Sequence, residues 1–174
     1  MTSDPFSILI RHNHWANGVL LERCAKLSAE QFHHKFPIGL ESLHDTIDHI
    51  IGCTESWVAR VRGEPRKDRH NLQTMAELHS RLDASTAAVT ELASQHALAG
   101  MIDRQVTVTF PASKGGTLDV TFTAGAAIVH CLVHGTHHRA QALNMLRQLN
   151  LADPLPELDV MDWQYEAENT KAII

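Results

Sequence analysis

His134 and His138 lie four residues apart in a long apolar segment near the C-terminal end of the chain. On a helix, residues four apart project from successive turns of nearly the same face, so both imidazoles can reach one metal ion. The surrounding residues are mostly Ala, Ile, Val, Leu and Met, a context in which solvation does not explain a pair of polar rings. The spacing therefore predicts a metal site on this helix.

The same segment contains two further histidines. His130 is also four residues from His134, so the pairs 130/134 and 134/138 are equally good by spacing alone. His137 projects about 60° away from the direction of His134 and is a weaker candidate. Two imidazoles leave a metal under-coordinated, so either pair requires a further ligand from another helix.

The segment that follows Ser42 offers His44 and His49 as this further ligand. Helical geometry places His44 among acidic residues, on the face that we expect toward solvent. His49 falls on the flank of the apolar stripe, beside Cys53, and is the better candidate. We expect Cys53 to be a small buried hydrophobe; the alternative is that it lines the pocket or competes as a soft ligand.

Arg139 directly follows the last of these histidines and projects toward an apolar side of the helix, near Leu143. A permanent charge in such a place needs a partner. We expect it to pair with a carboxylate or to cap a helix end from within the protein. The alternative is that it binds an anionic thiol or a carboxylate substrate.

The chain contains 13 histidines, more than its length of 174 residues would ordinarily carry. Several of them lie in polar or loop segments, where a histidine is usually solvated. We expect these at the surface: His12, His14, His33, His34, His70, His79 and His96.

Local signals along the chain predict four main helices. They run from Asp4-Pro5 to about Leu27, from Ser42 to Gly63, from Thr74 to about Leu98 and from about Ala124 to Leu149. A capping-box pattern at Ser28 predicts one short helical turn, and the tail suggests a short helix over Glu157 to Glu166.

Alternating apolar residues at 106–110 and 118–122 predict a small β-hairpin between the third and fourth helices, with a six-residue turn region over 111–116. We therefore expect an all-α protein, an antiparallel four-helix bundle with this hairpin, in a single domain of residues 1–174. The core of such a bundle commonly hosts metal sites.

Composition and charge indicate which partners and which cellular compartment to expect. The net charge is −5, and the charges are interleaved, so no basic patch predicts contact with nucleic acid. The sequence contains no run of 18 apolar residues, so we expect no membrane span. The N-terminal residues do not resemble a signal peptide. Three cysteines without CxxC spacing are typical of reduced thiols in the cytoplasm, where we expect the protein.

Three motifs resemble those of the DinB/YfiT-like family. They are Asn-His-Trp-Ala-Asn at 13–17, Ile-Asp-His-Ile at 47–50 with Trp57, and His-Gly-Thr-His-His-Arg-Ala-Gln at 134–141. Together, in order and spacing, they cover nearly the whole chain. One departure is Ala140, where the family often has glycine; this affects close packing and not ligation.

The resemblance implies a DinB-like four-helix bundle, often a homodimer, with a three-histidine site for a divalent metal. Carried over by motif, the ligands are His49, His134 and His138, and His130 becomes a neighbour one turn away. Zinc and nickel suit imidazole ligands, with iron and manganese as alternatives. The apolar and aromatic tail around Trp163 also favours dimerisation.

Three neutral imidazoles leave open positions on a metal, the arrangement of a catalytic site. A metal held in this way activates water or stabilises a thiolate, and some members of the superfamily are transferases or isomerases that depend on a thiol cofactor. We therefore expect a metal-dependent enzyme that acts on a small molecule with a low-molecular-weight thiol or water, such as a thiol S-transferase. The alternative is a metal-binding stress-response module without catalysis, which works through dimerisation or a partner.

Overall fold

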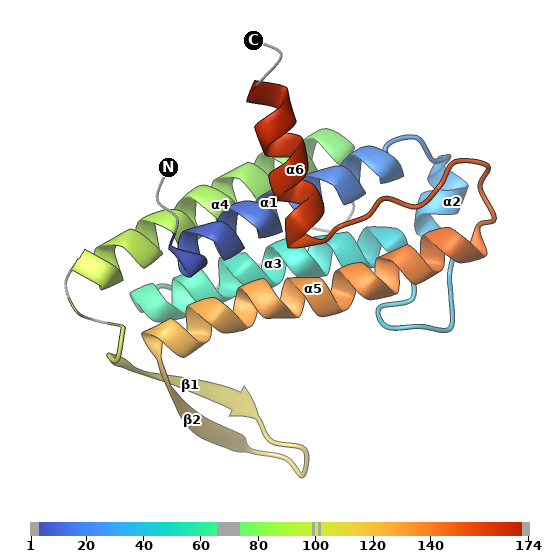
Figure 1. Ribbon diagram of the computed structural model, residues 1–174. Helices are drawn as coiled ribbons and strands as arrows, with labels where there is room; N and C mark the ends of the chain where they lie inside the picture. The colour runs from blue at the N-terminus through green and yellow to red at the C-terminus, as the bar shows by residue number, and fades with distance from the viewer. Residues whose placement is uncertain (1–3, 66–73, 99, 101, 172–174) are drawn as a thin grey trace.

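The computed structural model describes residues 4–65, 74–98, 100 and 102–171. These residues form six helices and a two-stranded antiparallel sheet (Figure 1). The helices are α1 (Pro5–Cys24), α2 (Ala29–His33), α3 (Leu43–Arg62), α4 (Met75–Leu98), α5 (Ala124–Gln148) and α6 (Val160–Lys171). The four main helices of the sequence analysis correspond to α1, α3, α4 and α5, while α2 and α6 are the short turn and the tail helix.

Two helix bounds differ from the expected ones. The first helix ends at Cys24 and not near Leu27. The tail helix begins at Val160, three residues later than Glu157, and continues to Lys171. Residues 151–159 before α6 form neither helix nor strand, which agrees with the two prolines that lie there.

Side-chain caps fix the starts of the two helices that carry the candidate site. The Ser42 hydroxyl accepts the amide N–H of Asp45 at the start of α3, and the Thr123 hydroxyl accepts that of Ala126 at the start of α5. Gly63 ends α3 in the left-handed conformation, with φ of 73°, which glycine adopts without a steric penalty. Caps also confirm the helix starts expected at Asp4, Ser28 and Thr74.

The four long helices lie side by side (Figure 1). Helix α3 contacts α4 and α5, and α1 contacts the same two helices. The short α2 packs on α3, and α6 packs on α1. Among the described residues, no helix combines the length and the apolar content needed to cross a bilayer.

The hairpin joins α4 to α5. Strand β1 (Gln105–Pro111) pairs with β2 (Thr117–Thr123), with Pro111 opposite Thr117. The turn is therefore residues 112–116, one residue shorter than expected. The ring of Phe122 meets Trp57 of α3 edge to face at a centroid distance of 5.6 Å, so the hairpin extends the hydrophobic core at this end.

The core consists of two hydrophobic clusters. One lies toward the hairpin and includes Trp57 and Leu132, and the other lies toward α2 and includes Leu43 and Met145. Along α5, His134 and His138 come between the residues of these two clusters, and on α3 His49 lies among the residues of the second cluster, between Ile47 and Ile51. Packing at both ends therefore fixes the two helices that carry the histidines.

Candidate metal centre

The structure brings His49 of α3 together with His134 and His138 of α5. The Nε2 atom of His134 lies 3.0 Å from Nε2 of His49 and 3.1 Å from Nε2 of His138. One ligand nitrogen of each ring lies within 4.8 Å of the others. Within the described residues, this is the group of three or more such side chains whose geometry could hold one metal ion.

The three rings also pack closely against one another. His134 and His138 meet at a centroid distance of 4.4 Å with planes 83° apart, and His49 and His138 at 4.5 Å with planes 74° apart. Because the nitrogens of an imidazole lie on its edge, the short Nε2 separations, and not the interplanar angles, show that these nitrogens converge. The three side chains therefore have the geometry of a ligand set.

The donor set fits a cation better than it fits hydrogen bonds alone. A neutral imidazole carries one N–H and one lone pair, so the single proton on His134 Nε2 cannot serve both of its neighbours fully. A metal ion accepts a lone pair from each ring. At about 2.0–2.1 Å from each nitrogen, an ion separates pairs of nitrogens by about 3.0–3.4 Å. The observed separations of 3.0 and 3.1 Å around His134 already lie within this range.

Electrostatics favour the neutral form of the two α5 ligands. Burial lowers the pKa of His134 from its ordinary value of 6.5, and the nearby histidines lower it further. Burial also lowers the pKa of His138, against a smaller opposing effect of its hydrogen bond to Gln141. Because only a neutral imidazole binds a metal, both shifts favour ligation near neutral pH.

The three rings lie at the edge of the α3–α5 contact. His49 and His134 are half-buried, and His138 is buried. Two of the three side chains thus remain partly accessible, which leaves a direction from which a small molecule can approach.

Two neighbours lie beside this group without joining it. His130 is exposed and stacks on His134 with planes 18° apart, and its ring meets Trp57 edge to face. The structure thus places the pair 134/138, and not 130/134, against His49. Cys53 is half-buried and packs on the hydrophobic cluster near the hairpin, in line with the expected packing role.

Arg139 occupies the opposite side of α5 from solvent and is 3% exposed. Its guanidinium donates to the side-chain oxygens of Asn13 at 2.6 Å and Asn17 at 3.0 Å on α1, and to the Thr136 hydroxyl at 2.9 Å. Among the described residues no carboxylate pairs with it, so the expected ion pair is wrong. Burial lowers its pKa to about 10, and amide oxygens satisfy its hydrogen bonds without a compensating charge.

Sequence reasoning missed the two asparagines as partners of Arg139. The sequence held only part of the signal, the spacing of four residues between Asn13 and Asn17 on one helix; the structure adds that both are buried. Gly135 is the third part of this arrangement: a Cβ added there would lie 2.8 Å from Asn13 Oδ1. The glycine in the motif therefore permits the close approach of α1 to α5.

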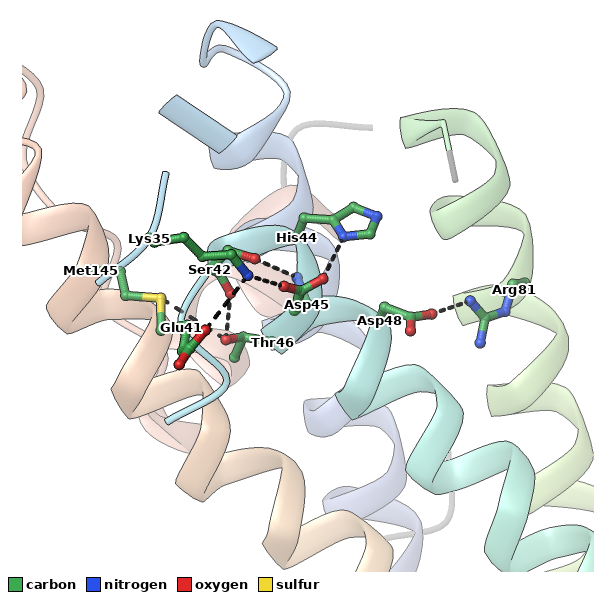
Figure 2. A network of polar contacts seen from close by, with 9 residues as sticks. All are labelled: Lys35, Glu41, Ser42, His44, Asp45, Thr46, Asp48, Arg81 and Met145. Carbon is green, nitrogen blue, oxygen red and sulfur yellow. Dashed lines mark hydrogen bonds and ion pairs between the residues drawn. The ribbon is translucent and has the colours of Figure 1, made fainter. Parts of the chain in front are cut away.

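The prediction that His44 faces solvent is wrong. The residue is 7% exposed, and its Nδ1 lies 3.0 Å from Asp45 Oδ1 (Figure 2). Its ring packs edge to face on Phe32 of α2 at 5.5 Å and against His33 at 4.7 Å. The physical reason is that α2 covers this face of α3, which the periodicity of α3 alone cannot reveal.

The surface prediction for the remaining histidines is correct for some and wrong for others. The prediction for His12 is wrong, because the tail before α6 covers it and its Nε2 lies 2.8 Å from the Leu158 carbonyl oxygen. His14 and His79 are half-buried, while His33 and His34 are exposed as expected. His70 and the side chain of His96 lie outside the described residues.

Comparison with known proteins agrees with the motifs. The model of the DinB family matches residues 2–169. This chain belongs to the DinB family. No curated protein sequence matches it.

Two crystal structures share the DinB fold with this protein. A DinB-like protein from Bacillus subtilis is 15% identical with a TM-score of 0.64, over 87% of this chain and 97% of that one. A protein assigned to the DinB family from Exiguobacterium sibiricum is 19% identical with a TM-score of 0.60, over 91% of this chain and 100% of that one. At these identities the likeness concerns the fold and not the activity.

Proposed function

We propose that this DinB-family protein binds one divalent metal ion through His49, His134 and His138 and uses the ion to activate a small thiol or water. The observation that carries this proposal is the convergence of three Nε2 atoms from two helices, with separations of 3.0 and 3.1 Å around His134. Zinc and nickel fit such ligands best, and iron or manganese are the alternatives.

The chemistry follows from the ligands being neutral. When bound, a divalent ion with three imidazoles keeps its full charge and acts as a Lewis acid, so a thiol or water there loses a proton near neutral pH. The side chains hold the site and keep it unprotonated, through the lowered pKa values of His134 and His138. The partial exposure of His49 gives a small molecule access. A thiol S-transferase is the specific activity that we propose.

The first test is metal content. Protein purified without an affinity tag should carry about one divalent ion per chain by mass spectrometry, and a His134→Ala variant should carry less than a tenth of that. His33→Ala is the matched control, because His33 is exposed and lies in a different cluster. Equal metal content in wild type and His134→Ala would contradict the proposal.

The second test concerns catalysis. Metal-loaded protein should convert an electrophile in the presence of one member of a panel of cellular thiols, and His134→Ala should not. Bound metal without turnover across the whole panel would instead support the non-catalytic, stress-response module.

We also propose that residues 1–174 form one domain, that the four long helices make up an antiparallel bundle, and that the chain forms a homodimer. Support for the dimer comes from α6, where Met161 and Tyr165 are 74% and 72% exposed and lie one helical turn apart. Light scattering should give about twice the chain mass of 19.3 kDa. A mass near that of one chain would refute the dimer.

A further inference from the structure

The carboxamide of Gln141 contacts two consecutive histidines of α5. Its Oε1 lies 2.8 Å from Nδ1 of His138, and its Nε2 lies 3.1 Å from Nε2 of His137. The spacings of three and four residues place all three side chains on adjacent turns. Gln141 therefore touches the nitrogen of His138 that does not point toward the candidate metal centre.

We propose that Gln141 is a positioning residue of this centre, which holds His138 in the tautomer that can bind a metal. Its Oε1 accepts the Nδ1–H of His138, so the lone pair of that ring lies on Nε2, 3.1 Å from His134 Nε2. Histidine ligands generally donate their second N–H to such an acceptor, which fixes both the tautomer and the ring orientation. This inference rests on the proposed function, because holding a tautomer for ligation matters only if the three histidines bind a metal.

The opposite orientation of the carboxamide would defeat ligation. With the amide reversed, its N–H would point at His138 Nδ1, and the proton of a neutral ring would then sit on Nε2. The observed orientation also lets the amide donate to His137 Nε2. The carboxamide oxygen of Gln141 thus accepts from the proposed ligand His138, and its amide nitrogen donates to the exposed His137.

The segment between α2 and α3 restricts this carboxamide from the other side. Gly39 has a φ of 54°, and a Cβ added to it would overlap the Oε1 and Cδ atoms of Gln141. The backbone at Gly39 therefore lies directly against the amide. Gln141 is held between its own helix and a separate segment, which gives it the fixed position that an orienting group needs.

The decisive test reads the tautomer directly. In metal-free protein above pH 8, nitrogen-15 NMR of the His138 ring should show a protonated Nδ1 and an unprotonated Nε2. In Gln141→Leu, which keeps the bulk and removes the acceptor, the proton should move substantially to Nε2, the form that free imidazole side chains favour. A wild-type ring protonated on Nε2, or a tautomer unchanged by Gln141→Leu, would overturn the proposal.

Zinc affinity provides the second readout. Gln141→Leu should weaken binding about 10- to 100-fold, the range typical of lost orienting groups, and Gln141→Glu should recover most of it because it keeps an acceptor oxygen. The matched control is Gln148→Leu on the same helix, since Gln148 is exposed and its amide contacts Asn144. Affinity unchanged in Gln141→Leu, or equally weak in Gln141→Glu, would contradict the positioning role.

The two readouts separate this inference from the proposed function. If wild-type protein binds no divalent ion, the proposed function fails, while the NMR result still shows whether Gln141 sets the tautomer. Gly39→Ala serves as an independent variant, because it displaces the carboxamide without changing α5. It should shift the His138 tautomer in the same direction as Gln141→Leu, and an unaltered tautomer would show that Gly39 does not hold the amide.

Discussion

Helix α3 carries two histidines in clusters of opposite character. At His49, the ring nitrogens of three histidines converge, and two pairs of Nε2 atoms lie 3.0 and 3.1 Å apart. At His44, the ring packs against Phe32 and His33. Its Nδ1 lies 3.0 Å from a carboxylate oxygen of Asp45, as Figure 2 shows. A cluster of histidines is therefore a candidate metal site only where its ring nitrogens converge, and not because of the number of histidines.

In the cluster at His44, charged and polar groups pair with one another, and its ring nitrogens do not converge. Asp45 accepts hydrogen bonds from Lys35, His44 and Ser42, and despite the opposing effect of burial these contacts hold the pKa of its carboxyl below the usual range. The Nε2 atom of His44 is buried, and no hydrogen-bond partner for it exists among the described residues. The cluster at His44 therefore joins α2 to α3 through packing and a polar network, and nothing in it gathers lone pairs.

The largest expected effect is on metal affinity. His134→Ala removes the ring next to both other ligands and should weaken zinc binding by more than about 100-fold, beyond the loss typical of an orienting group. His44→Phe should leave the affinity within about threefold of wild type, since its ring contributes to packing. Competition titrations with a chromophoric chelator measure both. Comparable losses in the two variants would erase the distinction between the clusters.

Stability should respond to zinc through only one cluster. Free zinc at 100 times the dissociation constant adds about 2.7 kcal/mol to the folded state, which for a chain of this length raises Tm by about 5–10 °C. The increase should vanish in His49→Ala and persist in His33→Ala. Differential scanning calorimetry provides the measurement, and an undiminished shift in His49→Ala would place the ion elsewhere.

Acid should act first at the three-histidine cluster. Because folding lowers the pKa values of His134 and His138, these rings are neutral at pH 7 and gain protons only below their ordinary value of 6.5. Zinc affinity should therefore stay nearly constant to below pH 6.5, and fall about tenfold per pH unit for each displacing proton once the pH passes the lowered pKa values of the folded state. The metal-free protein should begin to lose stability at higher pH, near 6.5, because the unfolded chain takes up protons before the folded one does.

Equilibrium dialysis from pH 8 to 5 tests the metal part of this prediction, and urea denaturation without metal tests the stability part. Zinc retained in full at pH 5 would contradict ligation by imidazoles alone.

The smallest effect concerns Asp45. A carboxyl with a lowered pKa stabilises the folded state above its unfolded pKa of about 3.9, and the contribution is lost as pH falls through the lower folded value. Asp45 is 44% exposed, so Asp45→Asn should cost less than about 1 kcal/mol at pH 7. Urea denaturation should show this difference shrinking below pH 4. A difference that first disappears near pH 6.5 would instead implicate a histidine.

The helices and the hairpin could be predicted because their signals are local. Caps at Asp4, Ser42 and Thr74 and the alternation in the two strands act within a few residues, and the structure contains all of them. The end of α1 at Cys24 was less predictable, because helix ends carry weaker signals than N-caps such as Ser42.

The candidate site was predictable in part. The i, i+4 spacing identified the α5 segment, and the position of His49 on the flank of the apolar stripe favoured it over His44. Spacing could not select 134/138 over 130/134, because this depends on how α5 is rotated against α3. The resemblance to the DinB family supplied that selection.

The errors share one cause, which is coverage by distant parts of the chain. His44 is buried under α2, and His12 is buried under the tail before α6. The local sequence predicted both at the surface. Arg139 finds amide oxygens on α1 because Gly135 lets the two helices approach closely. Each outcome depends on how separate elements pack, and the periodicity of a single helix does not reveal which other element covers it.

The most direct measurement is anomalous diffraction from crystals of zinc-loaded protein, recorded at the zinc edge. The account predicts a single strong peak about 2.0–2.1 Å from the Nε2 atoms of His49, His134 and His138. A peak beside His33 and His44, or the lack of any peak between α3 and α5, would contradict it.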